Sequence, residues 1–107
     1  MEPLQLTTTR RNGTLTVSVS GELDIATTER LRAHLLGLLQ EAGRGPHQQV
    51  ALVIEMSRLT FIDAAGLGIL VSARNHAQAQ QTPLRLTGVP PAVRRLLRIT
   101  GLEARLT

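Results

Sequence analysis

Apolar and polar residues alternate in two short segments near the start of the chain. The first is Leu4-Gln5-Leu6, and the second runs from Thr14 to Ser20. Alternation with a period of two is typical of strands that bury one face. Between the segments, Arg11-Asn12-Gly13 contains the Asn-Gly pair that favours a two-residue hairpin turn. The pattern therefore predicts an antiparallel β-hairpin.

The next segment follows the helical period instead. Four leucines share one face of a helix that begins after the Gly-Glu-Leu-Asp of residues 21–24: Leu31, Leu35, Leu38 and Leu39. Residues 43–46, Gly-Arg-Gly-Pro, end this helix because glycine frees the backbone and proline cannot continue it. Val50 to Met56 is a nearly continuous β-favouring run, which predicts a central strand covered on both faces.

Two more helices and two more strands complete the pattern. A second helix is expected from near Ala64 to about Gln80, with Leu67, Leu70 and Val71 facing inward. Leu84 to Thr87 reads as a short strand. Pro90 and Pro91 suit the first turn of a third helix, which Gly101 ends. Its expected inner face is Val93, Leu96, Leu97 and Thr100.

Glu103 to Thr107 is assigned as a final edge strand. The order is then β-β-α-β-α-β-α-β, which predicts an α/β fold: one domain over residues 1–107, with a mixed sheet and helices packed against it.

Composition narrows the function classes. The chain has no cysteine, and Phe61 is its only aromatic residue, so thiolate metal sites and aromatic stacking platforms are not expected. The three histidines, His34, His47 and His76, fall on different elements without ligand spacing, so we expect surface residues, no metal and no cofactor. No apolar run approaches the roughly 20 residues of a membrane span, and no signal-peptide core is visible. A cytoplasmic protein is the expectation.

The formal charge of +4 comes from twelve basic residues, all of them arginine. A positive charge favours acidic partners in general. The arginines are scattered along the sequence, with adjacent pairs only at Arg10-Arg11 and Arg94-Arg95. The sequence therefore gives little support to direct nucleic-acid binding.

The run from Phe61 to Leu70 contains the most informative motif. It places Asp63 at the junction between a strand and a helix, where free backbone N–H groups attract an anion or a capping carboxylate. The run resembles the signature of the STAS family of sulfate transporters and anti-sigma factor antagonists. Two further segments resemble the same family: the Gly-Glu-Leu-Asp of residues 21–24, and residues 88–97 with Thr100-Gly101-Leu102. The resemblance spans essentially the whole chain and is nearest to the small stand-alone antagonists.

The resemblance implies a mechanism of partner switching. In regulatory members, the unmodified antagonist binds an anti-sigma factor, usually a GHKL-type Ser/Thr kinase, and so frees a sigma factor for transcription. Phosphorylation of the residue after the motif's Asp releases the antagonist. Here that residue is Ala64, followed by Ala65, and alanine has no oxygen to phosphorylate. Ser57 and Thr60 are the nearby hydroxyls, but neither has the helix-start position. We therefore expect constitutive partner binding without phospho-release.

The expected partner-binding turn comprises Glu22, Asp24, Thr60, Asp63, Ala64, Ala65, Gly66 and Leu67. The three carboxylates of this set also have a purely structural interpretation. Asp63 would then only cap the helix, and Glu22 and Asp24 would be ordinary turn residues. No nucleophile or metal ligand accompanies them in sequence, so no enzyme is predicted. Gly66-Leu67-Gly68 is not a dinucleotide fingerprint, because the third glycine position holds Val71.

Three function classes remain open from the sequence. The leading class is an anti-sigma factor antagonist-like regulator. The second is a non-switching STAS accessory or scaffold subunit, in a lipid-transport ABC complex or a signalling assembly. The third is ligand or nucleotide binding, which gains little because no phosphate-binding loop is visible.

Overall fold

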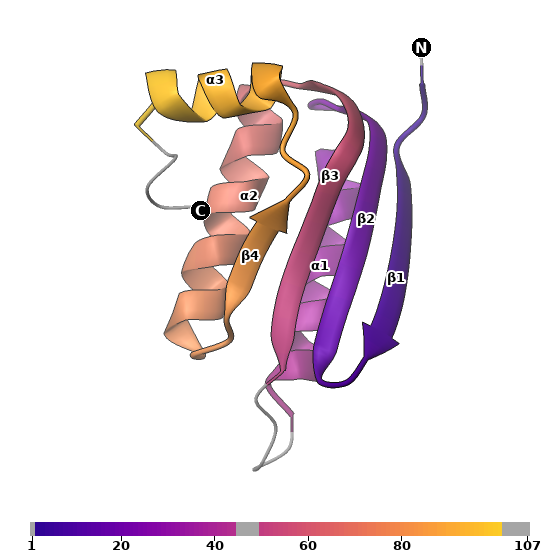
Figure 1. Ribbon diagram of the computed structural model, residues 1–107, viewed down its shortest axis with the longest axis vertical. Coiled ribbons are helices and arrows are strands. Elements are labelled where there is room, and N and C mark those ends of the chain that lie inside the picture. The colour runs from indigo at the N-terminus through magenta and orange to yellow at the C-terminus, as the bar shows by residue number, and fades with distance from the viewer. Residues whose placement is uncertain (1, 45–49, 102–107) are drawn as a thin grey trace.

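A four-stranded mixed sheet carries three helices in the computed structural model, which describes residues 2–44 and 50–101. The sheet order follows the chain, β1-β2-β3-β4 (Figure 1). The elements are β1 (Gln5–Arg11), β2 (Thr14–Leu23), α1 (Thr28–Ala42), β3 (Ala51–Ile62), α2 (Ala64–Ala79), β4 (Leu84–Thr87) and α3 (Pro91–Ile99). The predicted α/β class and element order are confirmed, while the expected strand over 103–107 lies outside the described residues.

The predicted hairpin joins β1 and β2. The two strands pair antiparallel from Gln5 opposite Ser20 to Arg11 opposite Thr14. Asn12 and Gly13 both have positive φ angles, 47° and 78°, which is the conformation of the type I′ turn that suits twisted strands. Both strands are longer than the alternating segments that predicted them.

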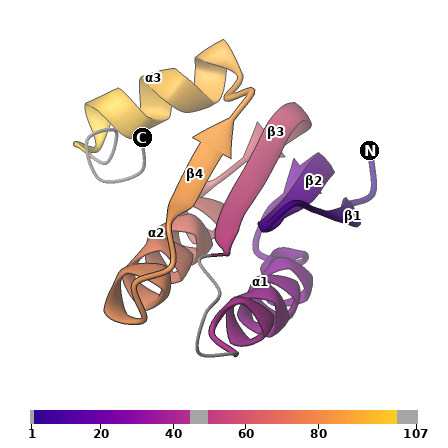
Figure 2. The ribbon, with the colours of Figure 1, turned by 60° about the horizontal axis from the view of Figure 1, so that its bottom comes forward.

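Two parallel crossovers build the rest of the sheet. β2 pairs parallel with β3, and β3 pairs parallel with β4. Crossovers between parallel strands are almost always right-handed. Both of these crossovers move in the same direction along the sheet, from β2 to β3 and from β3 to β4. Consequently α1 and α2 lie on the same face of the sheet, as Figure 2 shows from below.

The hydrophobic core lies between that face and the two helices. Every second residue of β2 is buried, including Leu15, Val17 and Val19, and the same alternation holds on β3 from Leu52 through Ile54 to Met56. The residues between them are half-buried or exposed, and α1 and α2 both lie on the other face (Figure 2). The expectation that β3 is covered on both faces was therefore wrong.

The helices keep the inner faces that the sequence predicted, with one exception. The four leucines of α1 are buried, as are Leu67 and Leu70 of α2, and Val71 is half-buried. On α3, Val93 and Leu97 are buried and Leu96 is half-buried. Thr100, however, is exposed just beyond the helix, and its hydroxyl donates a hydrogen bond to the Leu96 carbonyl oxygen at 2.7 Å.

No helix in the described ranges is both long enough and apolar enough to cross a lipid bilayer.

Candidate functional site

Asp63 caps the N-terminus of α2. Its backbone is extended, and its Oδ1 accepts a hydrogen bond from the Gly66 N–H at 3.0 Å. The Leu67 N–H then donates to the Asp63 carbonyl oxygen at 3.0 Å, which begins the regular helical ladder. Ala64 is therefore the first residue of the helix, and it is exposed.

The ends of β2 and β3 bring the two halves of the predicted site together. Glu22 lies opposite Phe61 in the parallel pair, and Leu23 lies opposite Ile62. The Asp63 N–H donates to the Leu23 carbonyl oxygen at 3.3 Å, so the pairing extends to the turn itself. The acidic segment after β2 and the start of α2 thus form one edge of the molecule.

Asp24 organises the loop between β2 and α1. Its Oδ1 accepts a hydrogen bond from the Ala26 N–H at 2.9 Å, closing a local turn before α1. The Thr27 hydroxyl donates to the Glu22 carbonyl oxygen at 3.0 Å. The Glu22 side chain also has a partner, since its Oε2 accepts from the Glu2 N–H at 2.9 Å. These contacts fix the acidic groups beside the start of α2.

The predicted site residues differ in their exposure. Thr60 and Ala64 are exposed, and Ala65 is half-buried. Gly66 and Leu67 are buried beneath the turn. A Cβ on Gly66 would lie 2.8 Å from Ile62 Cγ1 and 2.9 Å from Leu23 Cγ. The glycine therefore lets α2 approach the sheet closely, and the exposed members of the set are the ones available for contact.

Two apolar residues beside the turn were missed by the sequence reasoning. Ile25 is 80% exposed in the loop after Asp24, and Phe61 is 48% exposed at the end of β3. A signal existed for each, because Ile25 falls outside the helical period of α1 and Phe61 neighbours the buried Ile62 on the same strand. We call the resulting area the turn surface, made of Glu22, Asp24, Ile25, Thr60, Phe61, Asp63 and Ala64.

The side chains of the turn surface suit binding to another molecule. Its carboxylates flank exposed aliphatic and aromatic carbon, and it has no cysteine, histidine or serine side chain. In the described part of the chain, no three His, Asp or Glu side chains gather as a metal site would require. His34 shares a 2.6 Å hydrogen bond with the Thr8 hydroxyl, and His76 is exposed on α2. His47 lies outside the described residues.

Comparison with known proteins agrees with this fold and with the motif. The chain is 28% identical over 100 residues to the anti-sigma-B factor antagonist of Staphylococcus aureus, covering 94% of this chain and 87% of that protein. It is 29% identical over 99 residues to the anti-sigma F factor antagonist of Paenibacillus polymyxa, covering 92% and 80%. An anti-sigma factor antagonist from Mycobacterium paratuberculosis has a similar crystal structure, with a TM-score of 0.83 at 27% identity, covering 97% and 83%.

The match to a family is wider still. Residues 6–107 match the family described as "Mlab, STAS domain", which is nearly the full length of the sequence. The three sequence segments that resemble the STAS family and the capped turn at Asp63 all lie within that match. The chain belongs to the STAS domain family.

Proposed function

We propose that this chain is an anti-sigma factor antagonist-like regulator that binds an anti-sigma factor of the Ser/Thr-kinase type through the turn surface. The relatives named above are antagonists of anti-sigma factors, and they align over more than nine-tenths of this chain. The turn surface supports a binding role because Ile25 and Phe61 leave apolar area in water next to acidic groups. Exposed apolar residues bordered by charge are typical of protein contact sites.

The observation that carries the rest of the proposal is Ala64. It is exposed and is the first residue of α2, directly after the capping Asp63. A phosphate at this position would add a charge of about −1.5 to −2 beside the carboxylates of the turn surface, and the helix N-terminus would stabilise it. Alanine cannot carry it. The binding-competent form is then permanent, and the partner's kinase activity does not release the chain.

The two nearby hydroxyls are poor substitutes for the missing one. The Ser57 hydroxyl donates a 2.7 Å hydrogen bond to Glu55 Oε1, so a phosphate there would face a carboxylate. Thr60 is exposed but lies within β3, before the strand ends. Neither hydroxyl has the amide groups of a helix N-terminus to stabilise added negative charge.

The test is a reconstitution with the anti-sigma factors of the native host and ATP. We expect the wild-type chain to bind one of them and to stay bound without incorporating phosphate. The Ala64→Ser variant should take up one phosphate and dissociate, whereas Ala65→Ser, one residue further along, should behave as wild type. Stoichiometric phosphorylation of the wild-type chain would contradict the loss of the switch, and failure to bind any anti-sigma factor would contradict the regulator itself.

The same alanine supports a second function, a non-switching accessory or scaffold subunit of a transport or signalling assembly. A permanent subunit has no need of a phosphoacceptor, and the turn surface would then contact a constant partner. Affinity purification from the native host separates the two functions. Recovery of an ATPase with a permease supports the accessory subunit, and recovery of an anti-sigma kinase supports the regulator.

A further inference from the structure

Charge is distributed unevenly along this chain. Between Ala64 and Gly101 there are five arginines and no aspartate or glutamate: Arg74, Arg85, Arg94, Arg95 and Arg98. Three of the five lie within the nine residues of α3. This short helix therefore has a concentrated positive charge.

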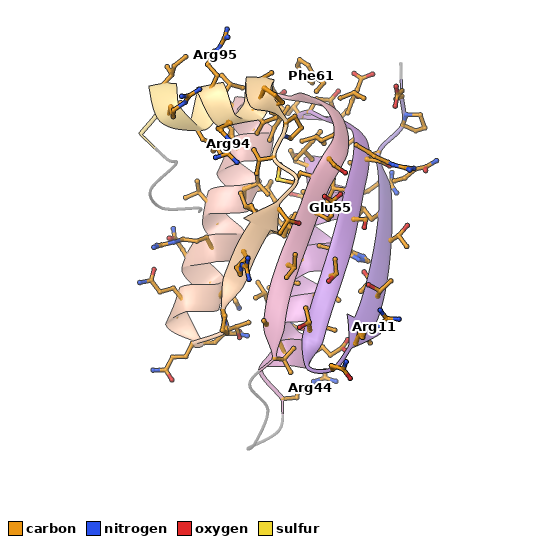
Figure 3. All side chains as sticks on the ribbon, viewed as in Figure 1. Arg11, Arg44, Glu55, Phe61, Arg94 and Arg95 are labelled. Carbon is orange, nitrogen blue, oxygen red and sulfur yellow. The ribbon has the colours of Figure 1, made fainter. Side chains whose placement is uncertain are left out.

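The fold displays that helix at the end of the molecule that also carries the turn surface. α3 crosses the end where β3 finishes and α2 begins (Figure 1). In Figure 3, Arg94 and Arg95 lie at the same end as Phe61, and Arg11 and Arg44 lie at the opposite end. Val93 and Leu97 are buried and hold α3 against the core, which turns its other side to solvent.

Three side chains on that outer side are neighbours. Arg95 and Arg98 are three residues apart, and Arg95 and Ile99 are four apart, so Arg98 and Ile99 each adjoin Arg95 on the helix surface. Ile99 is 74% exposed, and both arginines are exposed. Among the described residues, neither Arg95 nor Arg98 forms an ion pair with a carboxylate. We call Arg95, Arg98 and Ile99 the α3 patch.

We propose that the α3 patch is a docking site for an acidic protein surface that carries an apolar side chain among its carboxylates. Guanidinium groups bind carboxylates with two parallel hydrogen bonds, and Ile99 provides an apolar contact beside Arg95. This site is separate from the turn surface and does not depend on the partner being an anti-sigma factor. A partner that spans both would meet acidic groups at one side and basic groups at the other, which fixes its orientation.

A protein fits the α3 patch better than a lipid surface or a nucleic acid. Helices that lie in a membrane interface insert a broad apolar face, but the apolar face of α3 is already buried through Val93 and Leu97. Only Ile99 would remain to insert. Single-stranded nucleic acid is usually bound by aromatic platforms beside the cations, and α3 has no aromatic residue.

The test uses a synthetic helical peptide with glutamates along one face and one leucine among them, titrated against the full chain by fluorescence anisotropy. The variant Arg95→Gln/Arg98→Gln should weaken binding about threefold to thirtyfold, as expected for the loss of two exposed charge pairs. Arg11→Gln/Arg44→Gln changes the net charge equally at the opposite end and should change affinity less than about twofold. Arg95→Lys/Arg98→Lys should recover part of the affinity, which shows that the helix is intact.

A second comparison tests the apolar contact. With Ile99→Gln, the preference for the leucine peptide over its alanine version should disappear. Equal losses in the two arginine pairs would mean attraction to net charge alone and would overturn the proposal. Stronger binding to phosphatidylglycerol–phosphatidylcholine vesicles than to the peptide, lost in Arg95→Gln/Arg98→Gln, would overturn it in favour of a lipid surface.

Discussion

Two glycines in the first turns of α2 have opposite surroundings. A Cβ on Gly66 would lie 2.8 Å from Ile62 Cγ1, whereas a Cβ on Gly68 would meet nothing within 4 Å. We therefore predict that Gly66→Ala lowers the free energy of unfolding by about 1–3 kcal/mol, through overpacking between α2 and the sheet. Gly68→Ala should raise it by about 0.5–1 kcal/mol, because alanine favours the helix and nothing opposes it.

Urea denaturation of the two variants measures both values under one set of conditions. Each variant adds the same methyl group to the same helix, so the difference between them isolates the contact with Leu23 and Ile62. A stabilising effect of Gly66→Ala would show that α2 can shift away from the sheet at no cost. The close approach would then have no role in holding the Asp63 turn.

At this scale the sequence predicted the turn well and its surroundings less well. The cap at Asp63 and the helix start at Ala64 can be predicted from the local sequence, because a strand pattern ends there and a helical pattern begins. Local order gives a signal for the exposure of Phe61 and Ile25, but it does not decide that exposure. It depends on which faces of neighbouring strands and loops the rest of the chain covers, and that is decided by tertiary packing.

Among the elements, β1 is attached to α1 by polar side chains as well as by the core. An Arg30 guanidinium N–H donates at 2.8 Å to the carbonyl oxygen of Leu4, the residue before β1, and Thr8 of β1 shares a hydrogen bond with His34. At the far end, Arg10 forms a two-bond ion pair with Glu41, with N–O distances of 2.7 and 2.8 Å. These contacts hold the edge strand β1 to α1, a helix that packs on the same sheet.

The Arg10–Glu41 pair predicts a pH dependence of stability. The hydrogen bonds from Arg10 lower the pKa of the Glu41 carboxyl below its ordinary value of 4.5. Because the folded-state pKa is the lower one, the contribution is complete above pH 4.5 and disappears as the pH falls through the folded-state pKa. Glu41→Gln should therefore be less stable than wild type near neutral pH, and the difference should vanish in acid.

Urea denaturation of both proteins at about pH 7 and about pH 3 in low salt checks this dependence. Arg10→Gln and the double variant complete a mutant cycle, in which the coupling between the two sites should be present at neutral pH only. A destabilisation by Glu41→Gln that is the same at both pH values would show that the ion pair is not its cause.

Strand β3 shows what an apolar run can and cannot predict. The β-favouring residues predict the strand itself, but they do not predict which of its faces the helices cover. Val53 lies on the face away from α1 and α2, yet it is apolar like the residues of the buried face. The coverage is decided by topology: both crossovers step the same way, so α1 and α2 share one face. The serines and threonines on β1 and β2, such as Thr9, Thr16 and Ser18, fit the uncovered face.

The whole molecule combines a central unit with more lightly attached parts. β2 and β3 lie in the middle of the sheet, paired on both sides, and α1 and α2 pack over them. α3, in contrast, buries only Val93 and Leu97 fully and lies at one end. Elements with few buried contacts open locally at a lower free energy than the core. The turn surface therefore belongs to the stable central unit, whereas the α3 patch belongs to a helix that can open separately.

This difference predicts the pattern of amide hydrogen exchange. The amides of β2 and β3 should exchange only through global unfolding, while those of α3 should be at least about tenfold less protected. Binding of the acidic peptide to the α3 patch should raise the protection of α3, and it should raise that of β2 and β3 by the same factor, because global unfolding also destroys the site. Equal protection of α3 and β3 in the free chain would instead make α3 part of the global folding unit.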